Sequence, residues 1–156
     1  MAWFTEAGGR SVSNQLPYNV LWRTIERGIL PDCQARGHSV LCYSSLQQGL
    51  LSGKYTDPTQ LPSGRLRTRM FAPDRSPLSR HGSPGLEGEL FGPGGALAAL
   101  ADVAEAAGCS MADLSTAWLL AQPGVSVVIV GASTAAQVSE RASVCVWSTE
   151  ARSRRS

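Results

Sequence analysis

The sequence predicts an α/β fold in which parallel strands alternate with helices. Three short segments have the composition of strands, and they are residues 12–16, 39–44 and 125–130. The stretches between them contain helical periodicity, and neighbouring parallel strands require such helical crossovers. The hydrophobic content of 43% and the charged content of 17% indicate a globular chain, and 156 residues are enough for one domain with a core.

The first predicted strand ends before Pro17, because proline disfavours a helical backbone in the residue that precedes it. Helical spacing resumes around Ile25, and Pro31 suits the first turn of a second helical piece, where an N–H would have no helical partner. Gly37 is expected to end this piece. These residues therefore predict a helical connection between the first two strands.

The second and third predicted strands are apolar runs within residues 39–44 and 125–130. Runs of this length are typical of parallel strands that are buried on both faces. We therefore expect both strands to be covered on either side. Three such strands do not complete a parallel sheet, because each buried strand needs a neighbour on both sides.

Two helices are expected between the second and third strands, because apolar residues recur there at three- and four-residue spacing. Ser110 and Asp113 resemble a capping box at the start of the second helix. A final helix is expected from Thr134 to about Ala142, with Ser133 as its cap. The apolar residues of the first helix are Leu97, Leu100, Ala101 and Ala104, and those of the second are Leu114, Ala117, Trp118 and Ala121.

Composition argues against several classes of function. The net charge of +2, without a basic face of interleaved aromatics, argues against nucleic-acid binding. Four separated cysteines and two histidines favour neither a zinc site nor a disulfide framework, so we expect reduced thiols. The first residues do not resemble a signal peptide, and no apolar run approaches the ~20 residues of a membrane helix, so a cytoplasmic protein is expected.

Two candidate binding residues lie at the carboxyl ends of predicted strands, where parallel α/β folds bind ligands. The carboxamide of Gln15 could pair with another amide such as nicotinamide, and the ring of Tyr43 could stack on a planar ring. A simpler interpretation exists for each. Gln15 could bond the local backbone, and Tyr43 could be a core residue with its hydroxyl at the rim.

Phosphate could bind after the second strand. Gly49 permits a close approach to the backbone, and Lys54 could meet a phosphate, although a solvated lysine is the common outcome. Residues 56–95 are rich in Pro, Gly, Arg and Ser, so they form either a lid over a ligand or a disordered segment.

The start of the last predicted helix is a second place for a phosphate, because free N–H groups and the helix dipole attract anions. Gly131 and Ser133 open this helix. Gln137 and Glu140 lie three residues apart on one face, where they could reach an adenosine. An ordinary capped helix explains the same pattern equally well.

Taken together, these segments resemble the aldo-keto reductase family. Residues 14–23, NQLPYNVLWR, resemble the family pattern NQ-x-x-YNLL-x-R, and residues 43–55, YSSLQQGLLSGKY, resemble YSPL-x-QGLLTGKY. Residues 117–140 contain AWLL and VVIVGAS and end on a Gln and a Glu, which resembles AWLL…VIPGAS…Q-x-x-EN. The order and spacing match over about residues 10–142. The chain is similar to bacterial-type reductases and to the β subunits of potassium channels.

The resemblance implies an incomplete (β/α)8 TIM barrel, roughly strands 6 to 8 with their helices, from an NADP-dependent oxidoreductase. By this resemblance Gln15 holds the nicotinamide carboxamide and Tyr43 stacks on the nicotinamide ring. Further residues would surround the pyrophosphate, form a basic belt over the cofactor, or cradle the adenosine 2′-phosphate and adenine, which favours NADP over NAD. The residues around the pyrophosphate would be Ser44, Leu46 and Gly49. The basic belt would contain Lys54 and Arg65, which are looser matches. The cradle for the 2′-phosphate and adenine would consist of Gly131, Ser133, Gln137 and Glu140.

Three positions depart from the family motifs. Ser45 replaces the proline of YSPL, and Val130 replaces the proline of VIPGA. We expect both changes to be tolerated. Arg141 replaces the asparagine that follows the motif glutamate, which weakens the expected adenine contact.

The family's catalytic Asp, Tyr, Lys and His lie in the first half of its barrel, and no residue of this sequence matches them. Lys54 is the only lysine. We therefore expect no catalytic residue and no metal ligand, so that the isolated chain is inactive. The complete enzyme would reduce a small aldehyde or ketone with NADPH. Two alternatives stay open: a non-catalytic module that binds a nucleotide or a partner, and an unstable fragment from an incomplete gene model.

The family resemblance predicts two parts of unequal length. We expect residues 1–142 to form the C-terminal portion of an aldo-keto reductase-like domain and residues 143–156 to be an irregular tail outside the family. Unpaired strand edges recruit other chains, so self-association through open edges is also expected.

Overall fold

The computed structural model describes residues 11–57, 90–91 and 93–153. These residues belong to two compact units, one within residues 1–45 and 115–156 and the other within residues 46–114. Each unit is described by itself below.

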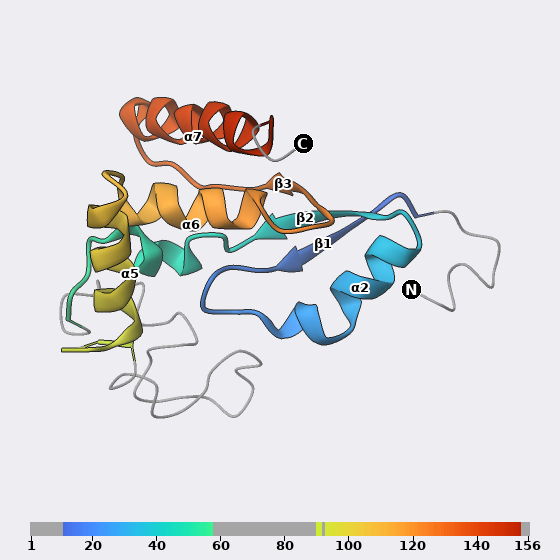
Figure 1. Ribbon diagram of the computed structural model, residues 1–156, viewed down its shortest axis with the longest axis horizontal. Helices are drawn as coiled ribbons and strands as arrows, with labels where there is room; N and C mark the ends of the chain where they lie inside the picture. Colours follow the sequence, from blue (N-terminus) through green and yellow to red (C-terminus); the bar gives the residue numbers. More distant parts are fainter. Residues whose placement is uncertain (1–10, 58–89, 92, 154–156) are drawn as a thin grey trace. The chain divides into compact units, whose positions relative to one another are not determined.

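The first unit contains a parallel three-stranded sheet (Figure 1). Its strands are β1 (Ser13–Pro17), β2 (Ser39–Tyr43) and β3 (Val125–Val128), in the order β1-β2-β3. In the register, Gln15 lies opposite Leu41, and Leu41 lies opposite Val127. The predicted α/β arrangement with parallel strands is therefore confirmed, although β3 ends before the predicted limit at residue 130.

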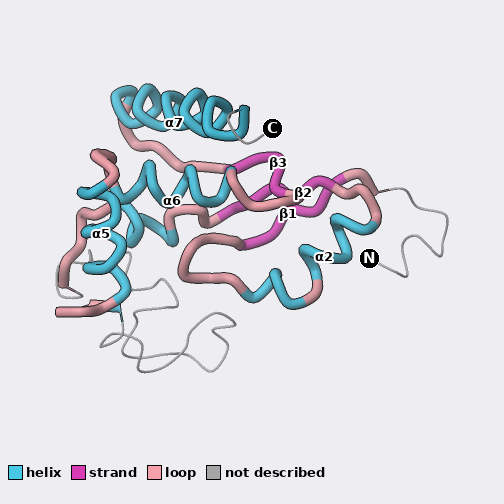
Figure 2. Tube along the Cα trace, viewed as in Figure 1, coloured by secondary structure: helices cyan, strands magenta, loops and turns pink. Residues whose placement is uncertain are grey.

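The connection between β1 and β2 is helical, as predicted (Figure 2). It consists of the 3-10 helix η1 (Thr24–Arg27) and the helix α2 (Ile29–Ala35). Pro31 lies in the first turn of α2, where its missing N–H costs no helical hydrogen bond. Gly37 follows the helix at a φ of 67°, a left-handed conformation that glycine adopts without strain.

One face of the sheet is buried in the core of the first unit. Burial raises the pKa of the Cys42 thiol to about 11, so this thiol is protonated at neutral pH. Cys33 and Cys42 are buried and free, and Cys109 of the second unit is partly buried and free. The core residues are Tyr18, Ile25, Leu30, Cys33, Val40, Cys42, Leu119 and Val125, with Leu16, Trp118 and Val128 packed against them.

On the opposite face of the sheet, several of the described side chains are exposed. Tyr43 is 37% exposed, Val127 is 44% exposed and Ile129 is 41% exposed. The prediction that β2 and β3 are buried on both faces is therefore wrong for this chain. An apolar run shows that a strand suits burial, but not whether the same chain supplies a layer for each face.

The second unit contains the 3-10 helix η2 (Gln47–Ser52), the helix α5 (Ala96–Ala106) and the start of α6 (Met111–Leu120). Leu97 and Ala104 of the predicted α5 face are buried, whereas Ala101 is exposed. The predicted cap of α6 is confirmed, because the Ser110 hydroxyl accepts a hydrogen bond of 3.1 Å from the Asp113 N–H.

The buried face of α6 differs from the apolar face that the sequence shows. The residues that are buried are Ala112, Ser115, Thr116 and Leu119. Their spacing is helical, but two of them are polar, and a pattern of apolar residues alone cannot reveal a face that contains buried hydroxyls. Of the predicted face, Trp118 is half-buried and Ala121 is exposed.

The last helix, α7, spans Ala135–Ser153. Residues 143–153 are therefore helical, and the expected irregular structure there is wrong. They contain neither Pro nor Gly, so nothing in their sequence breaks the helix. Among the described helices, none combines the length and the apolar character that crossing a membrane requires.

Candidate functional site

The carboxyl ends of the three parallel strands of the first unit lie at the same end of the sheet. Pro17 lies opposite Tyr43, and Cys42 lies opposite Val128. The Ile129 N–H donates a hydrogen bond of 2.8 Å to the Cys42 carbonyl and extends this alignment past the end of β3. The loops that follow β1, β2 and β3 therefore begin side by side, at the edge where parallel α/β sheets bind ligands.

Gln15 and Tyr43 lie on the same face of the sheet. Gln15 lies opposite Leu41, and Tyr43 follows Leu41 by two residues, so their side chains project to one side. Both residues are exposed. A carboxamide and an aromatic ring are thus accessible from the same direction, although Gln15 lies in the middle of β1 rather than at its predicted carboxyl end, whereas Tyr43 is the last residue of β2.

The loop after β1 is fixed by a buried asparagine that the sequence reasoning did not single out. Asn19 is fully buried, and its Oδ1 accepts hydrogen bonds of 2.9 Å from the Leu21 and Trp22 N–H groups. Its Nδ2 donates a hydrogen bond of 3.0 Å to the Ser44 carbonyl. Asn19 therefore shapes its own turn and ties that turn to the end of β2. A polar residue next to a core tyrosine is the signal that could have indicated this, since buried polar groups need partners.

The loop after β2 begins with an unusual backbone. Ser44 has a φ of 53°, which is uncommon for a residue other than glycine. The next residue, Ser45, is 2% exposed, and its hydroxyl donates a hydrogen bond of 2.7 Å to the Ile129 carbonyl. This loop is thus held on the β1 side through the Ser44 carbonyl and on the β3 side through the Ser45 hydroxyl.

Other predicted residues belong to the second unit. Gly49 has a φ of 96°, and its N–H donates to the Leu46 carbonyl over 2.9 Å, so the turn requires the left-handed backbone that glycine supplies. Lys54 is exposed. Arg65 lies outside the described residues, as does most of the predicted lid at residues 56–95.

The start of α7 differs from the expected anion site. Thr134, rather than Ser133, caps the helix, because its hydroxyl accepts a hydrogen bond of 3.3 Å from the Gln137 N–H. The Gln137 Oε1 in turn accepts a hydrogen bond of 2.7 Å from the Ser133 N–H. This arrangement resembles a capping box and occupies one N–H that a phosphate would need. Gly131 and Glu140 are exposed.

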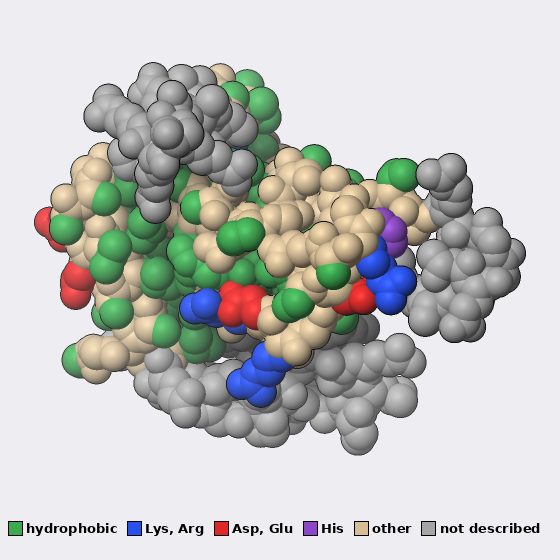
Figure 3. All heavy atoms as spheres, turned by 45° about the vertical axis from the view of Figure 1, so that its right-hand side comes forward, with side chains coloured by type: hydrophobic (Ala, Val, Ile, Leu, Met, Phe, Trp, Pro, Cys, Tyr) green, Lys and Arg blue, Asp and Glu red, His purple; other side chains and the backbone are tan. Residues whose placement is uncertain are grey.

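A cluster of aromatic and charged side chains supports the loop that contains Asn19. The Arg23 guanidinium contacts both carboxylate oxygens of Glu26, at 2.8 and 3.0 Å, and the Tyr18 hydroxyl donates to Glu26 over 2.6 Å. Arg23 also lies over the Trp118 ring, 5.2 Å from its centroid. On the face drawn in Figure 3, acidic and basic side chains similarly lie next to each other.

This cluster shifts the pKa values of three residues, and the hydrogen bond to Glu26 raises that of Arg23. Burial and the hydrogen bond to Glu26 raise the pKa of Tyr18 well above its usual value. The hydrogen bonds from Arg23 and Tyr18 lower the pKa of Glu26. A tyrosine held protonated in this way supports the structure and is poorly suited to release a proton near neutral pH.

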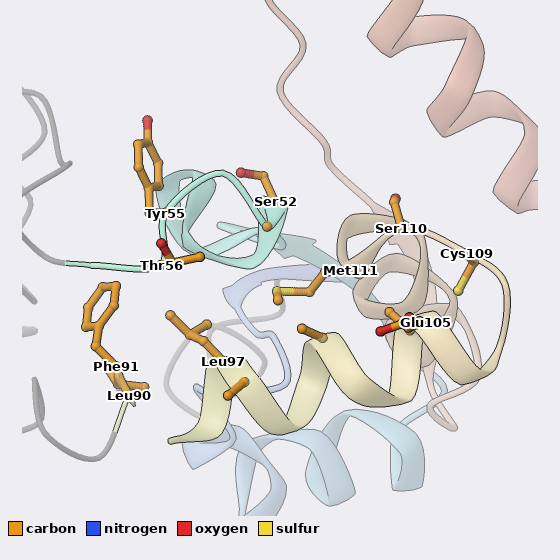
Figure 4. A pocket seen from close by; sticks show the side chains of 14 residues that line it. Ser52, Tyr55, Thr56, Leu90, Phe91, Leu97, Glu105, Cys109, Ser110 and Met111 are labelled. Carbon is orange, nitrogen blue, oxygen red and sulfur yellow. The ribbon is translucent and has the colours of Figure 1, made fainter. Parts of the chain in front are cut away.

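The second unit contains a cavity of about 560 Å³ between α5, the start of α6 and the segment around Tyr55 (Figure 4). Its wall is mostly apolar and includes Phe91, Leu97 and Met111. None of the predicted binding residues that the structure describes lines it. We therefore keep this cavity separate from the candidate site at the strand ends. The described residues also contain no cluster of three or more side chains that could hold a metal ion.

The chain is similar in sequence to a family of known proteins. A family model described as the aldo/keto reductase family matches residues 1–153. An L-glyceraldehyde 3-phosphate reductase of Escherichia coli is 32% identical over 132 residues, which are 81% of this chain and 34% of that protein. The chain spans about a third of the length of the curated relatives it matches.

Solved structures agree with this match. The glycerol dehydrogenase from Gluconobacter oxydans superposes with a TM-score of 0.63 and 30% identity, over 82% of this chain and 35% of that structure. An aldo-keto reductase from Klebsiella pneumoniae, solved in complex with NADPH, superposes with a TM-score of 0.54 and 25% identity, over 85% of this chain and 33% of that structure. The family predicted from the sequence motifs is confirmed.

The ion pair in the loop after β1 predicts a pH dependence of stability. Because the folded pKa of Glu26 lies below its unfolded value of about 4.3, the carboxylate stabilises the fold above that pH, and this contribution is lost as the pH falls through the folded pKa. We expect Glu26→Gln to lower the free energy of unfolding by about 1–2 kcal/mol at pH 7. The loss should become smaller as the pH falls below the unfolded value of about 4.3.

Urea denaturation at pH 7 and pH 3, followed by circular dichroism, measures both values. Asp32→Asn is the matched control, because its ion pair with Arg36 spans 2.8 Å but is about half exposed on both sides. It should cost under about 0.5 kcal/mol. An equal loss for Glu26→Gln at the two pH values would contradict the assigned role of the carboxylate.

Proposed function

Because the chain belongs to the aldo-keto reductase family, we propose that it forms the NADP(H)-binding part of an oxidoreductase that reduces aldehydes or ketones. The observation that carries this proposal is the meeting of three strand ends at one edge, with Gln15 and Tyr43 exposed on the same face. The complex of the Klebsiella pneumoniae relative with NADPH supports the choice of cofactor.

The proposed contacts follow the family motifs. Gln15 pairs with the nicotinamide carboxamide, Tyr43 stacks on the ring, and the bound cofactor supplies the hydride. The exposure of both residues fits such a ligand, and Gly49 is a further proposed contact by the family motif. Gln137 must rotate away from the Ser133 N–H before that group can bind a 2′-phosphate. The remaining proposed contacts are Ser44, Leu46, Lys54, Arg65, Gly131 and Glu140.

We further propose that β1 to β3 correspond to strands 6 to 8 of a (β/α)8 barrel. Their parallel order and their single covered face support this assignment, since the uncovered face would line the barrel interior. The boundary after residue 142 stays a prediction. Ser143 begins the departure from the family motifs, whereas the family match continues to residue 153.

The chain alone is expected to have no reductase activity. General acid catalysis is typically worth about 10²–10⁴ in rate, and no residue here matches the family's proton donor. The measurement is NADPH oxidation with a panel of aldehydes and quinones, compared with buffer. Turnover clearly above buffer that disappears in Tyr43→Ala would contradict the expectation. Binding of NADPH without turnover is equally consistent with a non-catalytic nucleotide-binding module.

The chain is expected to bind NADP(H) more tightly than NAD(H), because the start of α7 offers N–H donors to a 2′-phosphate. Fluorescence titration with both cofactors measures the preference. Ser133→Glu places a carboxylate where the phosphate would bind and should abolish the preference. Ser143→Glu makes the same change at an exposed position later in α7 and should preserve it. Equal affinities in the unmodified chain would remove the basis for NADP.

We also propose that the chain associates with itself through the open strand edges of its sheet. Val127 and Ile129 expose apolar surface at the edge strand β3, and each buried Å² of such surface is worth about 25 cal/mol. Size-exclusion chromatography with light scattering should show species larger than a monomer. Val127→Lys should shift them towards the monomer, whereas Val103→Lys, at an exposed valine of α5, should not. A monodisperse monomer with a sharp melting transition would contradict this proposal and favour an independent binding module.

A further inference from the structure

A buried serine joins the two loops to which the proposed function assigns the nicotinamide ring and the 2′-phosphate. Ser45 follows Tyr43 and Ser44 at the end of β2, and its hydroxyl donates to the Ile129 carbonyl over 2.7 Å. Ile129 precedes Gly131 by two residues. A single side chain thus connects the start of the β2 loop with the start of the β3 loop.

The position of this bond indicates what it does. The Ile129 N–H donates a backbone hydrogen bond to the Cys42 carbonyl. If both strands continued regularly, the next hydrogen bond between them would be donated by the Ser44 N–H to the Ile129 carbonyl. Ser44 has instead left the strand conformation, with a φ of 53°. The Ser45 hydroxyl donates to that same carbonyl, so the connection between the strands continues for one more step through a side chain.

The residue that makes this bond departs from the family motif. The family motif YSPL, which residues 43–46 resemble, has a proline in place of Ser45, and proline carries neither a hydroxyl nor an N–H. The serine is 2% exposed, so its hydroxyl is shielded from water on its own side of the bond, and removing the hydroxyl removes a hydrogen bond that water cannot easily replace at Ser45.

The opposite side of the same loop is held by Asn19, whose Nδ2 donates to the Ser44 carbonyl over 3.0 Å. Ser44 therefore lies between two side-chain bonds, one towards β1 and one towards β3. A left-handed backbone at a residue other than glycine persists only when its surroundings fix it. These two bonds supply such a constraint.

We propose that Ser45 is a positioning residue that holds the Tyr43–Ser44 loop and the Gly131–Ser133 loop in one fixed arrangement for the two ends of an NADP(H) molecule. This inference rests on the proposed function. The benefit is pre-organisation, because a ligand that contacts both loops need not pay for ordering them. A ligand that contacts only one loop gains less from the bond.

The test uses the full chain and its Ser45→Ala variant, which removes the hydroxyl and leaves the packing nearly unchanged. The probes are NADPH, reduced nicotinamide mononucleotide and adenosine 2′,5′-bisphosphate, each titrated separately. We expect Ser45→Ala to weaken NADPH binding by about three- to tenfold. Binding of either half-molecule should change by less than about twofold, because each half contacts one loop.

Ser11→Ala is the matched control. The Ser11 hydroxyl donates to the Ser13 carbonyl over 2.9 Å at the start of β1, at the other end of the strand, so its removal should leave all three affinities unchanged. Amide hydrogen exchange without ligand gives a second measurement. Exchange in residues 44–46 and 129–133 should accelerate together in Ser45→Ala and stay unchanged in Ser11→Ala.

The possible results separate the two proposals. Unchanged NADPH affinity in Ser45→Ala, with normal binding by the unmodified chain, would overturn the role of Ser45 and leave the proposed function intact. An equal loss for NADPH and both half-molecules would indicate general structural damage and would also overturn it. If the unmodified chain binds none of the three probes, the proposed function fails and the positioning role fails with it.

Discussion

The burial of one face of the parallel sheet is the constraint on which the rest of the first unit depends. Val40 and Cys42 are fully buried, and Tyr18 packs into the same cluster with no exposed surface. Once Tyr18 is fixed there, the next residue, Asn19, is buried as well and must find partners for its amide. It finds them in its own turn and in the Ser44 carbonyl, so packing of the core determines where the loop after β2 is held.

The same constraint determines which residues face a ligand. Side chains alternate along a strand, so burying Val40 and Cys42 turns Leu41 and Tyr43 to the opposite face. The register places Gln15 on that face too. A one-residue slip between β1 and β2 would turn Gln15 to the core side and separate it from Tyr43. The register of the strands alone therefore places Gln15 and Tyr43 on one face.

Sequence reasoning succeeded where a local pattern determines structure. The strands, the helical connection with Pro31 and the cap at Ser110 follow from residues that are neighbours in the chain. It failed where distant contacts decide. The buried face of α6 contains Ser115 and Thr116, whose burial depends on hydroxyl partners that hydrophobic spacing does not reveal.

The candidate site was predictable to a similar extent. Motif residues such as Gln15 and Tyr43 could be named from the sequence, but the bond from Ser45 to Ile129 joins residues 84 positions apart. The proposed cofactor binding and the proposed catalysis also depend on different parts of the protein. The strand-end loops are held by bonds within the first unit, whereas acid catalysis requires a proton donor that converges on the substrate from elsewhere. The tyrosine nearest these loops in the core, Tyr18, has its pKa raised by burial and by Glu26, so it cannot take over that role. The proposed cofactor-binding surface therefore rests on bonds within the first unit and not on a catalytic group.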